Sequence, residues 1–201
     1  MATGSQYGED SIIDYFFKSK GISSGFFVDV GAADGVEHSN TYNLGINGWS
    51  GILIEPDEVA FNNLLKLYGN NKSIKLINEA VYSTSEKRPF YKEPGQASTL
   101  SEQFRDKVIG LYGTKYDTKM ITCNPLYSIL DRLSSPKNID FLSVDAEGID
   151  MIVLDTMDWD RYTVSLLCVE HSMPKEDLRH YMESKNYKFY YETCGNTFYI
   201  R

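Results

Sequence analysis

The chain has 201 residues, 42% of them hydrophobic, and carries a formal net charge of −8 at pH 7. This length and apolar content suit a single domain spanning 1–201, with one substantial core. The lysines and arginines are scattered, which argues against a nucleic-acid partner because phosphate binding needs clustered cations. No apolar run approaches the ~20 residues of a membrane helix. Three widely spaced cysteines, Cys123, Cys168 and Cys194, indicate reduced thiols and a cytoplasmic protein.

The first half of the chain predicts strands that alternate with helices. The run 25–30, GFFVDV, is rich in Phe and Val and indicates a buried strand. A short helix is expected over 39–47 and a longer one over 57–70, where the apolar residues fall on one face. Two further strands are expected, at 51–56 and 74–81.

The second half continues this alternation and then changes. Strands are expected over 139–146 and 164–170 with a helix between them, and a helix over 174–186 begins with proline and acidic residues. The last two runs, 187–192 and 197–201, indicate an antiparallel hairpin. The order predicts an α/β, Rossmann-like sheet that is mostly parallel, ends in an antiparallel hairpin and has helices on both faces.

The stretch from about 82 to 122 fits this pattern less well. It is polar, contains Pro94-Gly95, and has one helix-like piece, 100–112. Loops of this length in compact domains are usually functional lids or disordered. We therefore expect an insertion or lid over the active site.

The turn 28-VDVGAADG-35 follows the first predicted strand, where open α/β sheets bind their ligands. Its glycines are not spaced as G-x-G-x-x-G, which disfavours a dinucleotide and an NAD-dependent oxidoreductase. Glu55 closes the second strand and can accept hydrogen bonds from ribose hydroxyls. Asn78 or Glu79, at the end of the third strand, could reach an adenine amino group. The combination indicates an S-adenosylmethionine site, while a purely structural turn remains the alternative.

Several short motifs occur in a specific order along most of the chain. They are 4-GSQYGED-10, 26-FFVDVGAADG-35, 39-SNTYNL-44, 48-GWSGILIEPD-57, 78-NEAV-81, 139-IDFLSVDAEG-148 and 169-VEH-171. With these motifs the sequence resembles the FkbM-type methyltransferases, which depend on S-adenosylmethionine. The resemblance implies a class I methyltransferase fold, in which a seven-stranded sheet ends in a hairpin.

The same resemblance implies a set of cofactor contacts. Asp29, Gly31 and Glu55 would bind the cofactor, and Asp34 and Gly35 would support the turn. The methionine end would face Asn40 and Thr41, with Gln6 and Asp10 folded back over it.

The motif 145-DAEG-148 offers groups for catalysis. Methyl transfer to a hydroxyl needs alignment of the acceptor and a group that takes its proton. Asp145 and Glu147 follow the fourth strand and His171 follows the fifth, so all three are expected to converge near the cofactor. Asp145 is also an expected cofactor contact, and a helix cap is its structural alternative. The three residues are in addition possible ligands for Mg²⁺.

The sequence therefore predicts an S-adenosylmethionine-dependent O-methyltransferase. Its acceptor is expected to be a small molecule or a glycan, and the glycan part rests on the family resemblance. Two alternatives stay open. The motif 124-NPLY-127 resembles that of amino-group methyltransferases, and the fold can also serve a non-catalytic S-adenosylmethionine-binding module.

Overall fold

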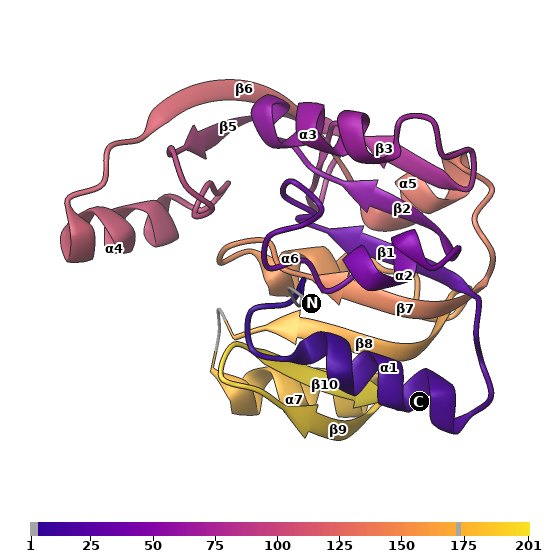
Figure 1. The fold of residues 1–201 in the computed structure, drawn as a ribbon. Coiled ribbons are helices and arrows are strands. Elements are labelled where there is room, and N and C mark those ends of the chain that lie inside the picture. The colour runs from indigo at the N-terminus through magenta and orange to yellow at the C-terminus, as the bar shows by residue number, and fades with distance from the viewer. Residues whose placement is uncertain (1–3, 172–173) are drawn as a thin grey trace.

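A computed structural model describes residues 4–171 and 174–201. Within them, a seven-stranded sheet has the order β3-β2-β1-β7-β8-β10-β9. Strand β1 (Phe26–Val30) lies near its centre and pairs in parallel with β2 (Ser50–Ile54) and β7 (Asn138–Val144) (Figure 1). The chain order reverses beside β1, so the carboxyl ends of β1, β2 and β7 form the edge at which such sheets bind ligands.

The outer strands complete this sheet. Strand β3 (Ile74–Ile77) pairs in parallel with β2, and β8 (Thr163–Glu170) with β7. Strand β10 (Asn196–Ile200) is antiparallel to both β8 and β9 (Lys188–Glu192). The predicted mostly parallel sheet with a closing antiparallel hairpin is confirmed.

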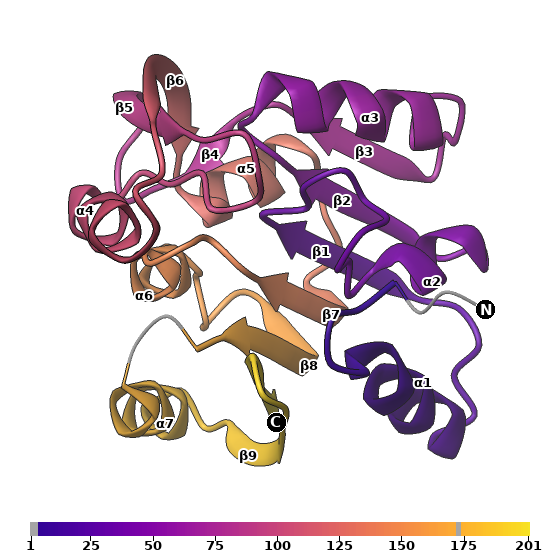
Figure 2. The ribbon, with the colours of Figure 1, turned by 60° about the vertical axis from the view of Figure 1, so that its left-hand side comes forward.

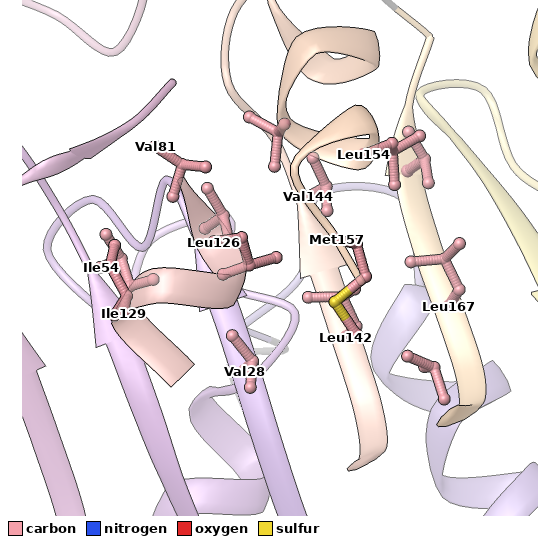
Figure 3. Packing of buried hydrophobic residues seen from close by; sticks show 14 of the residues in the cluster. Val28, Ile54, Val81, Leu126, Ile129, Leu142, Val144, Leu154, Met157 and Leu167 are labelled. Atoms are coloured by element: carbon pink, nitrogen blue, oxygen red, sulfur yellow. The ribbon is translucent and has the colours of Figure 1, made fainter. Parts of the chain in front are cut away.

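Helices cover both faces of the sheet, as predicted (Figure 2). Because the central strands are buried on both sides, successive residues contribute to different cores. Val28 packs in one cluster and Phe27 in the other. Figure 3 shows the first cluster, where Leu126 and Leu154 from helices meet Leu142 and Leu167 from strands. The first face carries α5 (Leu126–Arg132), α6 (Asp150–Asp155) and α7 (Lys175–Ser184), and the second carries α1 (Glu9–Ser19), α2 (Tyr42–Ile46) and α3 (Glu58–Tyr68).

A small three-stranded sheet lies beside the main one, and it corrects two expectations. The third strand expected over 74–81 is interrupted after β3, and β4 (Ala80–Val81) belongs to the small sheet. The polar stretch contains two strands that the sequence pattern did not indicate, β5 (Glu86–Lys92) and β6 (Asp117–Asn124), which pair antiparallel. Between them lies α4 (Glu102–Tyr112), which has no buried residue.

We call residues 82–122 the arm. Figure 1 shows it extending beyond the carboxyl ends of the parallel strands. Among the described residues, none of the helices has the length and apolar character needed to cross a membrane. Cys123 and Cys168 are buried and Cys194 is exposed, and all three thiols are free.

Candidate active site

The glycine turn after β1 is shaped by contacts with the protein itself. The backbone N–H groups of Gly31 and Ala32 both donate to the carbonyl oxygen of Ile54, at 3.0 and 3.1 Å. Gly31 has φ +84°, and a Cβ atom there would lie 1.7 Å from the carbonyl oxygen of Asp145. The glycine therefore allows the loops after β1 and β7 to cross, in addition to any ligand approach that the sequence suggested.

Glu55 joins this turn to the end of β2. Its Oε2 atom accepts a hydrogen bond from the Ala33 backbone N–H at 2.9 Å, and its Oε1 atom accepts one from the Asp57 N–H at 2.6 Å. The side chain is only 7% exposed. Burial raises the pKa of Glu55 to about 7, although both hydrogen bonds act in the opposite direction. Glu55 is thus held in one orientation, and it titrates near neutral pH.

Asp29 near the end of β1 is fixed by the segment before α2. The Thr41 hydroxyl donates a 2.6 Å hydrogen bond to its Oδ2 atom. Burial raises the pKa of Asp29 to about 6. Next to it, the Asn40 amide donates to the Ser143 hydroxyl at 3.2 Å, which ties this segment to β7. Thr41 is almost fully buried and orients Asp29 from behind.

A cavity of about 580 Å³ opens at the carboxyl ends of β1, β2 and β7. Its volume is in the range of ligand pockets. The turn after β1 and the ends of β2 and β7 form its walls, and arm residues 92–96 and 98–100 also line it. The predicted site residues that line it are Asp29, Gly31, Asp34, Asn40, Glu55, Glu79, Asp145 and Glu147.

Two predicted residues of the N-terminal segment, Gln6 and Asp10, do not line this cavity. Gln6 is exposed, and neither it nor Asp10 is part of the wall. Asp10 lies near the start of α1, where its carboxylate accepts hydrogen bonds from the Ser5 hydroxyl at 2.8 Å and the Asn43 amide at 3.1 Å. The bond from Asn43 connects α1 to α2. The expected contact of Asp10 with the cofactor stays a prediction.

Four other predicted residues also lie outside the wall. The Asn78 amide donates to the backbone carbonyl oxygens of Glu55 and Pro56, at 2.9 and 3.2 Å, and stabilises the end of β2. The His171 Nε2 atom lies 2.6 Å from the Thr197 hydroxyl, and burial lowers the pKa of its imidazole. Gly35 supports the glycine turn. Thr41 supports Asp29 through its hydrogen bond.

Three carboxyl groups gather beside the cavity, and one of them was not predicted. Oxygen atoms of Asp145, Glu147 and Glu170 all lie within 4.8 Å of one another. Burial raises the pKa of each. The charge of Asp145 raises the pKa values of Glu147 and Glu170 further, and the charges of Asp150 and Asp29 do the same for Asp145. His171 is not part of this group, so the predicted set of Mg²⁺ ligands is not formed. Glu170 is the last residue of β8, directly before His171, and this position was the available signal.

Contacts with the arm hold the loop that carries Glu147. This residue has φ +51°, which is unusual for a residue other than glycine, and Gly148 follows with φ +92°. The Thr99 hydroxyl donates to the Glu147 carbonyl oxygen at 2.7 Å. On another wall, the His38 Nδ1 atom lies 2.8 Å from Gln96 Oε1. The arm thus contacts both loops that flank the cavity.

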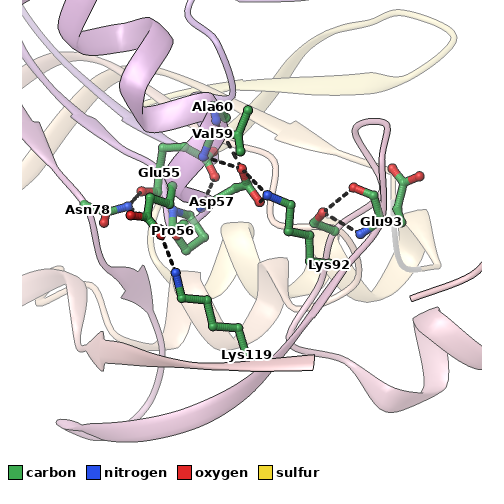
Figure 4. Close-up of polar contacts among 11 residues, drawn as sticks. Glu55, Pro56, Asp57, Val59, Ala60, Asn78, Lys92, Glu93 and Lys119 are labelled. Carbon is green, nitrogen blue, oxygen red and sulfur yellow. Dashed lines mark hydrogen bonds and ion pairs between the residues drawn. The ribbon is translucent and has the colours of Figure 1, made fainter. Parts of the chain in front are cut away.

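Two ion pairs connect the arm to the N-terminus of α3, as Figure 4 shows. Lys92 lies 2.8 Å from Asp57, and Lys119 pairs with Glu58. Asp57 also caps α3 by accepting hydrogen bonds from the first-turn N–H groups. Asp57 therefore contacts the arm, the helix and, through its own N–H, Glu55.

The 124-NPLY-127 motif lies outside the cavity. Asn124 ends β6, and its amide donates to Glu79 Oε2 at 2.9 Å, which also accepts from Arg132 at 2.9 Å. Pro125 is the N-cap of α5. Asn124 therefore contacts Glu79, and it is absent from the wall that Glu79 helps to form.

Comparison with known families gives this geometry a context. The sequence profile of the Methyltransferase FkbM domain matches residues 29–189. The chain belongs to the FkbM methyltransferase family. The matched range includes both cavity loops and the whole arm, and it confirms the resemblance seen in the sequence motifs. The FkbM domain of this chain is an S-adenosylmethionine-dependent methyltransferase domain.

Solved structures show the same fold at low sequence identity. An FkbM methyltransferase from Methylobacillus flagellatus is 16% identical with a TM-score of 0.57, covering 89% of this chain. A Pyrococcus horikoshii protein provisionally named as an RNA methyltransferase is 11% identical with a TM-score of 0.53, covering 98% of this chain and 86% of its own. The chain spans 44% of the length of the FkbM structure. None of the curated proteins searched matches the sequence.

Proposed function

We propose that this protein transfers a methyl group from S-adenosylmethionine to a hydroxyl group of an uncharged, sugar-like acceptor. The observation that carries the proposal is a single cavity that Asp29 and Glu55 share with Glu147 and with the arm. When bound, the cofactor supplies an activated methyl group on its sulfonium. The residues of this chain must therefore bind the cofactor, orient the acceptor and take up its proton.

Glu55 and Asp29 fit the cofactor in chemical type. Each Glu55 oxygen accepts one backbone N–H, which leaves capacity on both for hydroxyl donors such as those of a ribose. Asp29 has a pKa of about 6, so it is mostly ionised at neutral pH and suits a cationic ligand. Gly31 keeps the turn free of a side chain beside both residues.

The charge of the cavity wall supports an uncharged acceptor. Among the described residues that line it, Lys92 is the only lysine or arginine, and its charge is paired with Asp57. A phosphorylated or carboxylated acceptor would be repelled by such a wall, and a nucleic acid even more so. A neutral polyol can use the same carboxylates as hydrogen-bond acceptors. The acidic residues of the wall are Asp29, Asp34, Glu37, Glu55, Asp57, Glu79, Glu93, Asp145 and Glu147.

Glu147 is the residue to which we assign proton uptake. It lines the cavity, whereas His171 does not and is engaged with Thr197. Burial and the charge of Asp145 raise the pKa of Glu147 to about 9, so its carboxylate is a strong base in those molecules in which it has lost its own proton. Residues in strained backbone conformations are frequent at active sites, and Glu147 has a positive φ.

The test is methyl transfer from isotopically labelled S-adenosylmethionine to a panel of acceptors. The panel pairs neutral oligosaccharides with the corresponding phosphorylated sugars and includes amines as the alternative acceptor class. We expect labelled methyl ethers from neutral acceptors, identified by NMR. Glu147→Gln should lower turnover by about 10²-fold or more while S-adenosylhomocysteine affinity changes little. Glu102→Gln on α4, outside the cavity wall, is the matched control.

Three outcomes contradict the proposal. Methylated amines as the main product would favour the amino-group alternative. A preference for phosphorylated sugars would overturn the argument from wall charge. Unchanged turnover in Glu147→Gln would remove that residue from proton uptake.

A further inference from the structure

The loop after β7 presents Glu147 to the cavity in an unusual backbone conformation. Glu147 has φ +51° and Gly148 has φ +92°, so two successive residues lie in the left-handed region. That region is unfavourable for a residue with a Cβ atom, and it persists only where neighbouring contacts enforce it. Within the loop, the Ala146 N–H donates to Asp150 Oδ1 at 2.7 Å, which fixes the residue before Glu147. The peptide group after Glu147 is held by the arm.

Thr99 of the arm makes the hydrogen bond to this peptide group. Its hydroxyl oxygen lies 2.7 Å from the Glu147 carbonyl oxygen, and the side chain is almost fully buried. The same hydroxyl oxygen accepts the Ser101 backbone N–H at 2.8 Å. A threonine hydroxyl has one proton, and a carbonyl oxygen can only accept, so the proton must point to Glu147. The two partners of Thr99 therefore determine the direction of the bond.

A second contact from the arm reaches the next residue of the loop. A Cβ atom added to Gly148 would lie 2.9 Å from Phe104 Cβ, so the first turn of α4 packs directly against the backbone at Gly148. Ser101 holds Phe104 in this place, because it is the N-cap of α4 and its hydroxyl accepts the Phe104 N–H at 3.1 Å. The arm thus contacts both left-handed residues of the loop.

Thr99 also closes the part of the arm that lines the cavity. Its backbone exchanges two hydrogen bonds with Tyr91, at 2.8 and 2.9 Å. Between these two residues the chain turns back on itself, and the Glu93 carboxylate accepts the Ala97 N–H at 2.6 Å. Residues 92–96 and 98–100 line the cavity. Thr99 therefore joins the arm's share of the cavity wall to the loop that carries Glu147.

We propose that Thr99 is a positioning residue that holds the Glu147 peptide group in its left-handed conformation and thereby directs the Glu147 carboxylate at the acceptor. The inference rests on the proposed function, in which Glu147 takes up the acceptor proton. Thr99 acts through the backbone of Glu147, because its one proton is used there. The arm accordingly sets the geometry of proton uptake in addition to lining the cavity.

Two substitutions separate the hydrogen bond from packing. Thr99→Val keeps the shape of the side chain and removes the donor, whereas Thr99→Ser keeps the hydroxyl. Thr118→Val, at an exposed position of β6, is the matched control. We expect kcat to fall by about tenfold or more in Thr99→Val, while the acceptor KM and the affinity for S-adenosylhomocysteine stay within about twofold of the wild type. Thr99→Ser should recover most of the turnover.

The Glu147→Gln background tests whether Thr99 acts through the carboxylate. Adding Thr99→Val to Glu147→Gln should lower turnover by less than about a further twofold, because the group that Thr99 positions is already lost. A purely structural role of Thr99 would lower turnover by the same factor in both backgrounds.

An NMR signal reports the hydrogen bond without any acceptor. Glu147-Gly148 is the only Glu-Gly pair in the sequence, so a full chain labelled with carbonyl-¹³C glutamate and ¹⁵N glycine gives a single carbonyl-to-amide correlation. A hydrogen bond to a carbonyl oxygen moves the signal of its carbon downfield. We therefore expect the Glu147 carbonyl signal to move upfield in Thr99→Val and to stay in place in Thr118→Val, with Thr99→Ser close to the wild type.

Four results would overturn the inference. An unchanged carbonyl signal in Thr99→Val would show that the bond is absent in solution. Equal losses of turnover in the two backgrounds, equal behaviour of Thr99→Val and Thr99→Ser, or a Thr99→Val chain that does not fold would reduce Thr99 to a structural residue. If the wild type methylates no acceptor, the proposed function fails, while the carbonyl signal still decides whether Thr99 holds Glu147.

Discussion

Lys92 on β5 lies 2.8 Å from Asp57, and the backbone N–H of Asp57 lies 2.6 Å from Glu55. The arm and the expected ribose-binding carboxylate thus meet at one residue. Figure 4 shows the two contacts on neighbouring parts of Asp57. Because the contact to Glu55 comes from the backbone, it survives when the ion pair is removed. Acceptor binding can therefore be perturbed at Lys92 without direct damage to the cofactor site.

Lys92→Met should raise the acceptor KM severalfold and leave cofactor affinity almost unchanged. The pair is partly exposed, so its loss should change the free energy of unfolding by only about 0.2–1 kcal/mol. Initial-rate kinetics at low and high salt measure this difference in KM. The difference should be smaller at high salt, because salt screens the ion pair in the wild type. Lys119→Met removes the more exposed pair with Glu58 and should change KM less. An unchanged KM in Lys92→Met would show that this pair does not hold the arm.

Gly31→Ala should destabilise the protein far more than a glycine substitution at a comparable backbone angle. The new Cβ would lie 1.7 Å from the Asp145 carbonyl oxygen, so the crossing loops must separate. Gly48 has a similar φ, +87°, but no atom within 4 Å of the added Cβ, which makes Gly48→Ala the control. We expect the control to lose about 1 kcal/mol and Gly31→Ala at least about 2 kcal/mol more. Denaturant unfolding measures both; equal losses would contradict the close approach.

Thr41→Val should weaken cofactor binding through Asp29. The substitution removes the 2.6 Å hydrogen bond that stabilises the ionised carboxylate, at a cost of about 1.5–3 kcal/mol. The pKa of Asp29, already raised to about 6, should rise further, so the deficit in affinity should be larger at pH 6.5 than at pH 8.5. Thr41→Ser keeps the hydroxyl and should bind as the wild type does. Calorimetric titration with S-adenosylmethionine at both pH values measures the deficit in affinity. An equal deficit at pH 6.5 and pH 8.5 would contradict a role of Thr41 through the ionisation of Asp29.

The stability of the unliganded protein should fall as pH rises from about 5 to about 8. Asp29 and Glu55 have pKa values of about 6 and 7, above those of an unfolded chain, so the folded state binds more protons in this window. The carboxyl cluster acts in the same direction. Below pH 4 the stability should instead fall as the pH is lowered, because hydrogen bonds from Tyr162 and Arg161 lower the pKa of Asp131 to about 2.

Urea unfolding at a series of pH values measures this dependence. Glu55→Gln removes one of the titrating groups and should make the decline less steep. A stability that is constant or rises between pH 5 and 8 would show that these carboxylates are not desolvated in solution as they are in the structure.

The sheet was predictable because its strands are short apolar runs and its hairpin has a clear turn signal. Helix α1 was not predicted, although Ile13, Phe16 and Phe17 lie at helical spacing and form one buried face. Strands β5 and β6 carry few buried residues, and so neither shows the alternation that marks a half-buried strand. The two strands are stabilised by pairing with each other. The hydrophobic periodicity of a single segment does not predict such pairing.

At the site, sequence position indicated which residues follow a strand but not where their side chains point. Glu55, Asp145 and Glu147 reach the cavity, whereas Asn78 and His171 turn to backbone and side-chain partners nearby. Thr41 acts on Asp29 from behind the wall. Such supporting roles depend on contacts between distant segments, for instance 12 residues apart for Thr41 and Asp29. The proximity of Glu170 to Asp145 and Glu147 is likewise a product of the fold, which brings the ends of β7 and β8 together.

The arm leaves the core and returns to it at nearly the same place. Ala80 and Val81 pair with Cys123 and Asn124, and the Tyr82 N–H donates to the Asn124 carbonyl oxygen at 3.1 Å. A segment whose two ends are adjacent can change in length or sequence with little effect on the sheet that holds it. The arm can therefore be replaced as a unit, and related enzymes could acquire new acceptors through such a replacement. Grafting a foreign arm between residues 82 and 122 would then alter acceptor choice while the methyl donor stays the same.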